Sequence, residues 1–203
     1  MFQLPDARYY PSFLGERMQV GMIVNDLEQA LTFWTEVMDV GPWIVIEQSL
    51  GDREFVHRGE VSPVDMSVAF SYIGETQFEL IAQNNDAPSA YREFLEEGRE
   101  GVQHLAFWPD DYEHACAELE RRGFEEVTVV RTADGEKNVS YFAGPPLLGV
   151  LIEVIPVTEA RRQYVAAMEA LARTWDGTRP IRRFASRADF LVSADVASLE
   201  RQP

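Results

Sequence analysis

The pattern of apolar and polar residues in the first half of the chain predicts a strand, a helix and three further strands. An apolar segment at 18–24 precedes Asn25 and Asp26, which can accept hydrogen bonds from the first free amides of a helix. Apolar residues at three- and four-residue steps indicate that helix: Leu27, Ala30, Leu31, Trp34, Val37 and Met38. Gly41 and Pro42 end it. The strands expected after it cover residues 43–47, 64–73 and 76–83.

The same order returns in the second half of the chain. A polar connector at 84–101, with a short helix around 89–97, separates the two halves. An apolar strand at 102–108 then leads to a helix at 111–122, which Gly123 closes. The strands expected after this helix cover residues 126–132, 139–143 and 150–155. We therefore predict two βαβββ modules, at about 17–83 and 102–157.

Two short motifs support a duplication. The segment 18–30 has a counterpart in 103–115, where an apolar strand is again followed by an acidic turn and a helix. The segment 77–81 has a counterpart in 151–155. Four polar side chains occupy equivalent places in these segments: Gln19, Glu79, His104 and Glu153. Oxygen and nitrogen donors at matching positions of a repeat indicate a metal site between the two modules.

Strand alternation adds weight to the two carboxylates. Side chains along a strand point to opposite faces in turn, so each candidate ligand shares its face with small or apolar neighbours. A carboxylate on such a face is costly unless it is paired or bound to a metal. Glu79 and Glu153 both have this environment in the predicted strands. A divalent cation would relieve their mutual repulsion.

Composition narrows the function classes. The 203 residues are 46% hydrophobic and 26% charged, which is typical of a soluble globular protein. A formal charge of −16 disfavours nucleic acid and anionic membranes as partners. An anionic substrate remains compatible with the sequence, because a local arginine cluster can override the global field. Cys116 has no partner for an internal disulfide, and we find neither a membrane-length apolar run nor a signal peptide, so we expect a cytoplasmic protein.

A C-terminal extension at 158–203 follows the second module. Its helix carries an apolar stripe that predicts packing against the sheet or a neighbouring subunit: Tyr164, Met168, Leu171 and Trp175. Beyond Thr178 the chain is polar and interrupted by Pro180, which predicts a tail along the surface.

The motifs together resemble the vicinal-oxygen-chelate superfamily, which includes glyoxalase I, methylmalonyl-CoA epimerase, antibiotic-resistance proteins and extradiol dioxygenases. The residues that carry the resemblance lie in the openings at 19–27 and 104–107, in Phe33 and Trp34, in 41–43, and in the closings at 78–81 and 149–156. The resemblance covers about residues 17–157. It implies an α+β fold, with two tandem βαβββ modules forming a curled mixed sheet around a metal-centred cavity, plus the C-terminal helix.

The resemblance also implies a ligand set. The family's four metal positions fall on Gln19, Glu79, His104 and Glu153, a set similar to that of one branch of glyoxalase I. Two carboxylates, an imidazole and an amide oxygen suit a divalent ion such as Zn, Ni, Co or Mn. Extradiol dioxygenases hold Fe(II) with two histidines and a carboxylate, and Gln19 stands where the second histidine would be. We therefore do not expect an oxygenase.

The chemistry expected at such a site is proton transfer next to a carbonyl. Glu79 and Glu153 are the candidate catalytic bases, for an isomerase, epimerase or lyase reaction of glyoxalase-like type. The substrate would be a small, apolar organic compound, with Trp43, Trp108 and Glu47 as possible cavity residues. We expect a homodimer. Two alternatives stay open: a non-catalytic protein of the same fold that binds or sequesters a small molecule, and a metal-stabilised structural or regulatory subunit.

The individual residues also have simpler interpretations. Gln19 could be an ordinary residue at a strand start, and His104 alone would more often be a structural histidine than a ligand. Cys116 fits a packing role on the second helix. Buried glutamates are harder to explain without a site.

Overall fold

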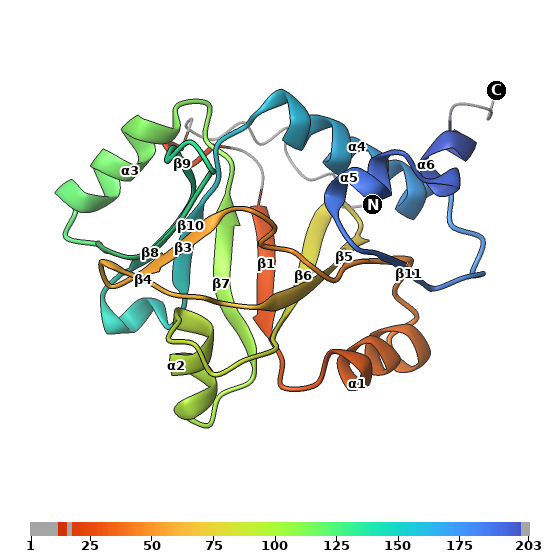
Figure 1. Cartoon of the computed structure of the whole chain (residues 1–203), viewed down its shortest axis with the longest axis horizontal. Helices are drawn as coiled ribbons and strands as arrows, with labels where there is room; N and C mark the ends of the chain where they lie inside the picture. Colours follow the sequence, from red (N-terminus) through yellow and green to blue (C-terminus); the bar gives the residue numbers. More distant parts are fainter. Residues whose placement is uncertain (1–11, 16–17, 200–203) are drawn as a thin grey trace, which may run out of the picture.

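The computed structural model describes residues 12–15 and 18–199 as one sheet with helices on both of its faces (Figure 1). The strands are β1 (Met18–Ile23), β2 (Trp43–Ile46), β3 (Glu54–His57), β4 (Glu60–Val61), β5 (Met66–Ile73), β6 (Thr76–Gln83), β7 (Gly101–Phe107), β8 (Glu125–Arg131), β9 (Lys137–Ala143), β10 (Leu151–Val154) and β11 (Ile181–Phe184). The helices are α1 (Leu27–Thr32), α2 (Ala90–Glu96), α3 (Tyr112–Arg121), α4 (Glu159–Arg173), α5 (Arg187–Leu191) and α6 (Ala194–Leu199), with a π-helical turn η1 (Phe33–Val37) and a 3-10 turn η2 (Pro146–Leu148).

The order of strands shows the duplication directly. Across the sheet the strands run β11-β2-β5-β6-β1-β7-β10-β9-β8-β3-β4. The first module contributes β2-β5-β6-β1 and the second β7-β10-β9-β8, so the two are mirrored about the central antiparallel pair β1–β7. In each module the first strand pairs in parallel with the last one, β1 with β6 and β7 with β10. The predicted α+β fold of tandem βαβββ units in one curled sheet is confirmed.

The sheet extends beyond the two modules at both edges. The hairpin β3–β4, inserted between β2 and β5, pairs with β8 of the second module. At the other edge β11 pairs in parallel with β2, so the segment expected to be a surface tail joins the sheet. Both additions escaped the sequence analysis because their strands are at most four residues long and their partners are distant in the chain. Such strands depend on their partners more than on their own pattern.

Three groups of buried side chains hold the layers together. Helix α1 packs on one face of the first module, with Leu31, Trp43 and Leu80 among the buried residues. Helix α3 packs on the equivalent face of the second module. The opposite face of the curled sheet is covered by α2, α4 and α5, which supply Tyr91, Met168 and Phe190 among others to the largest cluster. The predicted packing of α4 against the sheet is therefore confirmed, and Figure 1 shows α4 lying across one end of the strands.

The end of the first helix differs from its prediction. Val37 and Met38 were expected on the buried face, but they are 68% and 48% exposed. The π-helical turn η1 explains this difference, since the amide of Met38 donates to the carbonyl of Phe33, five residues earlier. An extra residue in the turn rotates the following side chains away from the sheet.

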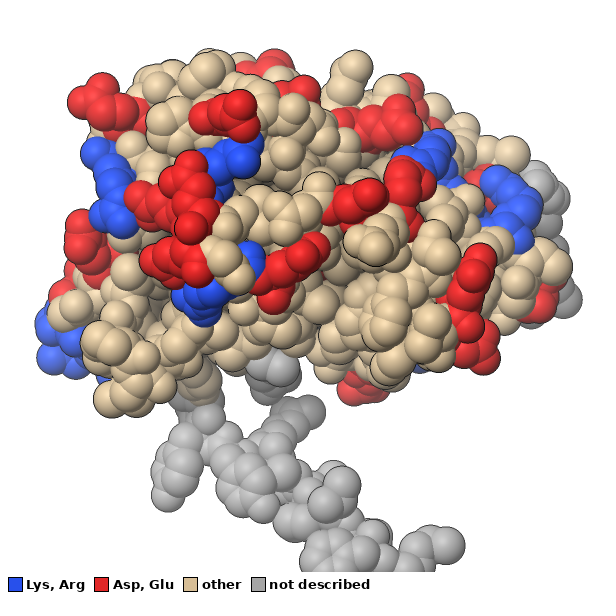
Figure 2. All heavy atoms as spheres, turned by 90° about the horizontal axis from the view of Figure 1, so that it is seen from below, with Lys and Arg blue, Asp and Glu red and all other residues tan. Residues whose placement is uncertain are grey.

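The surface reflects the formal charge of −16. Figure 2 shows acidic side chains spread across one face, with basic side chains beside many of them. Several arginines of the described residues form ion pairs, such as Arg58 with Glu93 and Arg183 with Glu28. None of the helices formed by the described residues has the length and apolar character needed to span a bilayer.

Candidate metal centre

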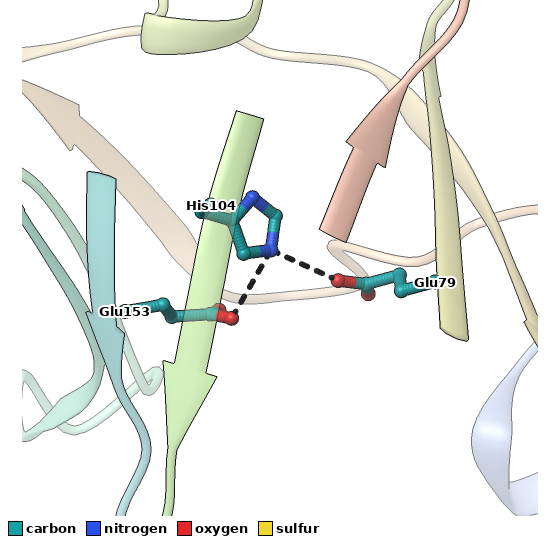
Figure 3. Close-up of side chains that lie close together, drawn as sticks. All are labelled: Glu79, His104 and Glu153. Carbon is teal, nitrogen blue, oxygen red and sulfur yellow. Dashed lines mark ion pairs between the residues drawn. The ribbon is translucent and has the colours of Figure 1, made fainter. Parts of the chain in front are cut away.

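The register of the central strands brings three candidate ligands to one place. Gly21 on β1 lies opposite Glu79 on β6 and also opposite His104 on β7. Glu153 on β10 lies opposite Ala106, which follows His104 by two residues on β7 and therefore shares its face of the sheet. The three polar side chains therefore project from neighbouring strands toward one point above the module junction (Figure 3).

The three side chains are close enough to share one ion. The Nε2 atom of His104 lies 3.4 Å from Oε2 of Glu79 and 3.3 Å from Oε2 of Glu153. One ligand atom from each residue lies within 4.8 Å of those of the other two. The residues are also buried, with His104 fully enclosed and Glu79 and Glu153 only 7% and 4% exposed. Two buried carboxylates at one imidazole are an arrangement that needs a cation or protons to balance it.

A neighbouring side chain sets the orientation of the imidazole. Nδ1 of His104 lies 2.7 Å from Oε1 of Gln103, whose amide nitrogen donates to the carbonyl of Ala90. Because that amide orientation leaves an oxygen facing Nδ1, the imidazole must carry a proton there and donate it. The lone pair of the neutral ring then lies on Nε2, which faces the two carboxylates. This is how metal-binding histidines are usually held.

Sequence analysis missed Gln103. Strict alternation places it on the face opposite His104, and only its position beside the histidine could have suggested contact. The strand pairing changes register between Gly21 and Met22 at this level, so simple alternation does not describe the local geometry.

Small residues make room for the ligands. A Cβ on Gly21 would stand 1.8 Å from Nε2 of His104, so only glycine permits the ring to lie there. Ala106 separates Glu153 from Gln19 in the register of β10, β7 and β1. The site is therefore shaped by the backbone of β1 as much as by its ligands.

Electrostatics in the site follow from burial and proximity. Burial raises the pKa of Glu79, the hydrogen bond from His104 opposes that shift, and the charge of Glu153 adds to it. For His104 burial alone would lower the pKa, but the charge of Glu153 and the hydrogen bonds to both carboxylates outweigh it and raise the pKa to about 9. Without a metal ion, the site thus holds a proton on the imidazole.

The residues fit a divalent metal ion. Apart from the contacts of these ligands with one another, Nε2 of His104 and Oε2 of Glu153 are buried atoms without a hydrogen-bond partner among the described residues. Both are metal-binding atoms, and they face each other and Glu79. One nitrogen and two carboxylate oxygens suit borderline and hard divalent ions. The donor set and its unsatisfied atoms therefore support metal binding by Glu79, His104 and Glu153.

Gln19, the fourth predicted ligand, lies on the same face of the sheet. It is paired with Ala106 on β7 and with Gln77 on β6, and it is 3% exposed. Its place in the first module corresponds to that of His104 in the second, as the pairings β1–β6 and β7–β10 show. No hydrogen bond of its side chain is found among the described residues. Its role as a ligand stays a prediction.

The structure places the predicted cavity residues at three separate sites. Trp43 is fully buried in the cluster under α1, with its indole nitrogen donating to the carbonyl of Val40. Glu47 has a 53% exposed side chain and lies 3.8 Å from Arg183 on β11. Trp108 lines a separate pocket beside α4. The geometry therefore separates Trp43 and Glu47 from the three ligands: Trp43 lies on the sheet face opposite Glu79, and Glu47 points to solvent.

Two tyrosines form one wall of the centre. The ring of Tyr141 meets the imidazole of His104 edge-on, with centroids 5.2 Å apart, and Tyr141 is the register partner of Glu153. Its hydroxyl lies 3.0 Å from that of Tyr91 on α2. Burial raises the pKa of both phenols, and the charge of Glu153 adds to the shift, so both stay protonated. They keep this side of the centre closed and uncharged.

Comparison with known proteins places the chain in a family. Residues 18–141 match the family model described as the Glyoxalase/Bleomycin resistance protein/Dioxygenase superfamily, which covers more than half of the chain. The chain belongs to this superfamily. The resemblance predicted from the repeated motifs is therefore confirmed. The matched region contains β1, β6 and β7, and the C-terminal extension lies outside it.

Solved structures are similar to this chain at low sequence identity, and the first of those that follow supports the fold. Methylmalonyl-CoA epimerase from Mycobacterium tuberculosis is 19% identical over 76% of this chain and 97% of its own, with a TM-score of 0.53. A hypothetical protein from Bacillus halodurans C-125 is 20% identical over 70% of this chain and 93% of its own, with a TM-score of 0.49. A mutant of 4-hydroxymandelate synthase from Streptomyces coelicolor is 15% identical over 68% of this chain and 37% of its own, with a TM-score of 0.48. Among curated proteins, none matches this chain.

Proposed function

We propose that this superfamily member is a metal-dependent enzyme that transfers a proton next to a carbonyl group of a small organic substrate. One observation carries the proposal: the buried Nε2 of His104 faces Oε2 of Glu79 and Oε2 of Glu153 at 3.4 and 3.3 Å. Glu79, His104 and Glu153, with Gln19 beside them, would hold the ion. The donor set fits Zn, Ni, Co or Mn.

The chain's own residues would handle the proton. A divalent ion in this site supplies stabilisation of the negative charge that develops when a proton leaves the carbon beside a carbonyl. Glu79 and Glu153 lie on either side of His104, and a carboxylate within hydrogen-bond reach of substrate can accept that proton and return it. Burial raises the pKa of Glu79, which makes its carboxylate a stronger base toward the substrate proton. Isomerase, epimerase and lyase reactions share this step.

The ligand set argues against an oxygenase. Non-haem Fe(II) oxygenases hold iron with two histidines and one carboxylate. Here one histidine stands with two carboxylates, and the equivalent of His104 in the first module is Gln19. We therefore assign proton transfer without O₂ to this site.

Sequestration of a small molecule without chemistry is the competing function. A binding protein of this fold has no need for two buried carboxylates at a histidine, because each costs free energy unless an ion balances it. Gln103, which orients His104, is an additional element that a sequestering protein would not require. These features favour an enzyme. The homodimer and the cytoplasmic location expected from the sequence stay predictions, and light scattering would measure the former.

Exchange of a substrate proton tests the proposal. Protein loaded with Zn, Ni, Co or Mn would be incubated in deuterated water with α-hydroxyketones, hemithioacetals of 2-oxoaldehydes and 2-substituted thioesters, and proton signals followed by NMR. We expect exchange at the carbon beside the carbonyl of at least one class, its loss with chelator, and its return with metal. The same exchange should continue under argon. Exchange that survives chelation, or turnover that consumes O₂ stoichiometrically, would contradict the proposal.

A further inference from the structure

A second cluster of functional side chains lies in a pocket of about 400 Å³, away from the three ligands. The pocket forms where the loop after β2, strand β9 and the helices α4 and α5 meet. Arg53, Arg161 and Arg187 all line it. Two of these arginines belong to the C-terminal extension, and the third belongs to the loop that leads into the inserted hairpin.

Shared acceptors hold the three guanidinium groups side by side. Oδ1 of Asn138 accepts from Nη2 of Arg161 at 2.9 Å and from Nη1 of Arg53 at 3.3 Å. The carbonyl of Ser49 accepts from Nη1 of Arg187 at 2.7 Å and also from Nη2 of Arg53. Arg53 is therefore linked through a single oxygen atom to each of the other two. Three like charges are fixed within a short distance.

Within the described part of the chain, no carboxylate forms an ion pair with these three arginines. Among the described residues, none of the three arginines has an acidic partner within ion-pair distance, although Asp52 also lines the pocket. Burial, together with the charges of Arg187 and Arg161, lowers the pKa of Arg53 to about 10. The chain has 34 acidic residues, and several arginines elsewhere pair with them, as Arg58 and Arg183 do.

The arginines keep donors for a ligand. A guanidinium group has five N–H donors, and Arg187 uses Nη1 and Nη2 toward Ser49 while its Nε has no protein acceptor among the described residues. The Nε of Arg161 is likewise without one. Carboxylate and phosphate oxygens bind such groups in pairs. The amino-terminal end of α4 adds to the positive field, since Thr158, its N-cap residue, also lines the pocket.

The pocket lies on the same side of the sheet as the metal centre. Phe70 on β5 is the register partner of Glu79, so the two side chains share a face and stand next to each other. The guanidinium of Arg187 lies 5.9 Å from the ring centroid of Phe70 and 5.6 Å from that of Tyr164. Phe70 therefore bridges the space between Glu79 and Arg187. Arg187 is close enough to the metal centre for its charge to lower the pKa of Glu79, against the effect of burial.

We propose that Arg53, Arg161 and Arg187 bind an anionic group, a carboxylate or a phosphate, of the molecule whose carbonyl the metal centre receives. The statement that the carbonyl of the same molecule reaches the metal centre rests on the proposed function. The anion site itself rests on the geometry of the three arginines. It narrows the substrate to a carbonyl compound with a negatively charged end, in place of the apolar compound expected from the sequence. Two of the three arginines, Arg161 and Arg187, lie outside the matched superfamily region, and Arg53 lies within it.

Paired inhibitors test the inference. Hydroxamic acids chelate divalent metals, so two series of increasing chain length would be compared on metal-loaded protein by calorimetry, one ending in a carboxylate and one in a methyl group. We expect one chain length at which the carboxylate binds at least about tenfold more tightly. Arg187→Gln should remove that advantage, whereas Arg121→Gln, which removes an exposed charge on α3, should keep it. Equal binding of both series at every length would overturn the proposal.

Inorganic phosphate provides a test that does not need the metal. Titrated into the His104→Ala variant at constant ionic strength, it should bind saturably, and Arg187→Gln added to that variant should weaken binding by about tenfold. Arg187→Lys should bind with intermediate affinity, because it keeps the charge and loses the paired donors. Absence of saturable binding would overturn the anion site. If hydroxamates of both series fail to bind while phosphate binds, the metal proposal fails and the anion site stands.

Discussion

The imidazole of His104 lies directly over the backbone of Gly21, so close that a Cβ there would stand 1.8 Å from Nε2. The two residues are register partners across the antiparallel pair that joins the modules. The place where the duplicated halves meet is therefore the place where the histidine is positioned. Any side chain on Gly21 must displace the ring and, with it, the geometry of the centre.

Gly21→Ala should thus lose stoichiometric metal and be destabilised by about 1–3 kcal/mol, a typical cost of overpacking. Gly144→Ala is a matched control, because its Cβ would meet the ring of Phe124 at 2.4 Å, away from the ligands. That control should lose stability but keep metal. Denaturant unfolding and elemental analysis measure the two effects. Full metal content in Gly21→Ala would show that the ring does not need its present position.

Gln103 is expected to act through His104. Gln103→Ala removes the acceptor for Nδ1 and leaves the ring free to turn or change tautomer, so metal affinity should fall by roughly 10- to 100-fold. Gln29→Ala, on the exposed side of α1, should have no effect. Competition with a chromogenic chelator gives both affinities. Equal affinities in the two variants would mean that the hydrogen bond to Gln103 does not orient the ligand.

The pH dependence of stability should carry the signature of His104. In metal-free protein the pKa of this residue is raised to about 9, above its unfolded value of about 6.5. Its stabilising contribution is therefore fully present below about pH 6.5 and is lost as the pH rises through about 9. Chelator-treated protein should lose stability across this window, and His104→Ala should lose less. A parent protein that gains stability between these pH values would contradict the assignment.

If Glu79 or Glu153 is the catalytic base, replacing that residue with glutamine should reduce proton exchange, whereas replacing a glutamate outside the centre should not. Glu79→Gln and Glu153→Gln keep the size of the side chain and remove its basic group, so at least one should retain much of its metal yet lose exchange activity by about 10² or more. Glu47→Gln, whose parent side chain faces solvent, should exchange normally. Exchange at the parent rate in both Glu79→Gln and Glu153→Gln would remove these carboxylates as bases.

Much of the fold could be predicted because it depends on local patterns that occur twice. The strand alternation around Glu79 and His104 correctly predicted that both share one face, and the register places them across Gly21. The prediction of a hairpin at Gly74 and Glu75 was also correct, since Ile73 pairs with Thr76. These features need only the period of each strand and the residues of its turn.

The unpredicted features depend on contacts between distant segments. Arg53 and Arg187 are 134 positions apart in the chain, yet both bind the carbonyl of Ser49. Nothing in the pattern around either residue indicates the other. Trp43 was a possible cavity residue or, equally, part of the core between sheet and helix, and strand alternation on β2 turns it toward α1. Long-range pairing and the choice of face decide such cases, and neither can be read from one segment alone.

The central claim is that Glu79, His104 and Glu153 hold one divalent metal ion, and elemental analysis of protein purified without chelator tests it most directly. We expect about one ion per chain in the parent protein and in His114→Ala, whose exposed imidazole lies on α3. His104→Ala and Glu153→Ala should lose it while remaining folded by circular dichroism. Full metal content in both of these variants, or none in the parent after incubation with Zn, Ni, Co and Mn, would contradict the account.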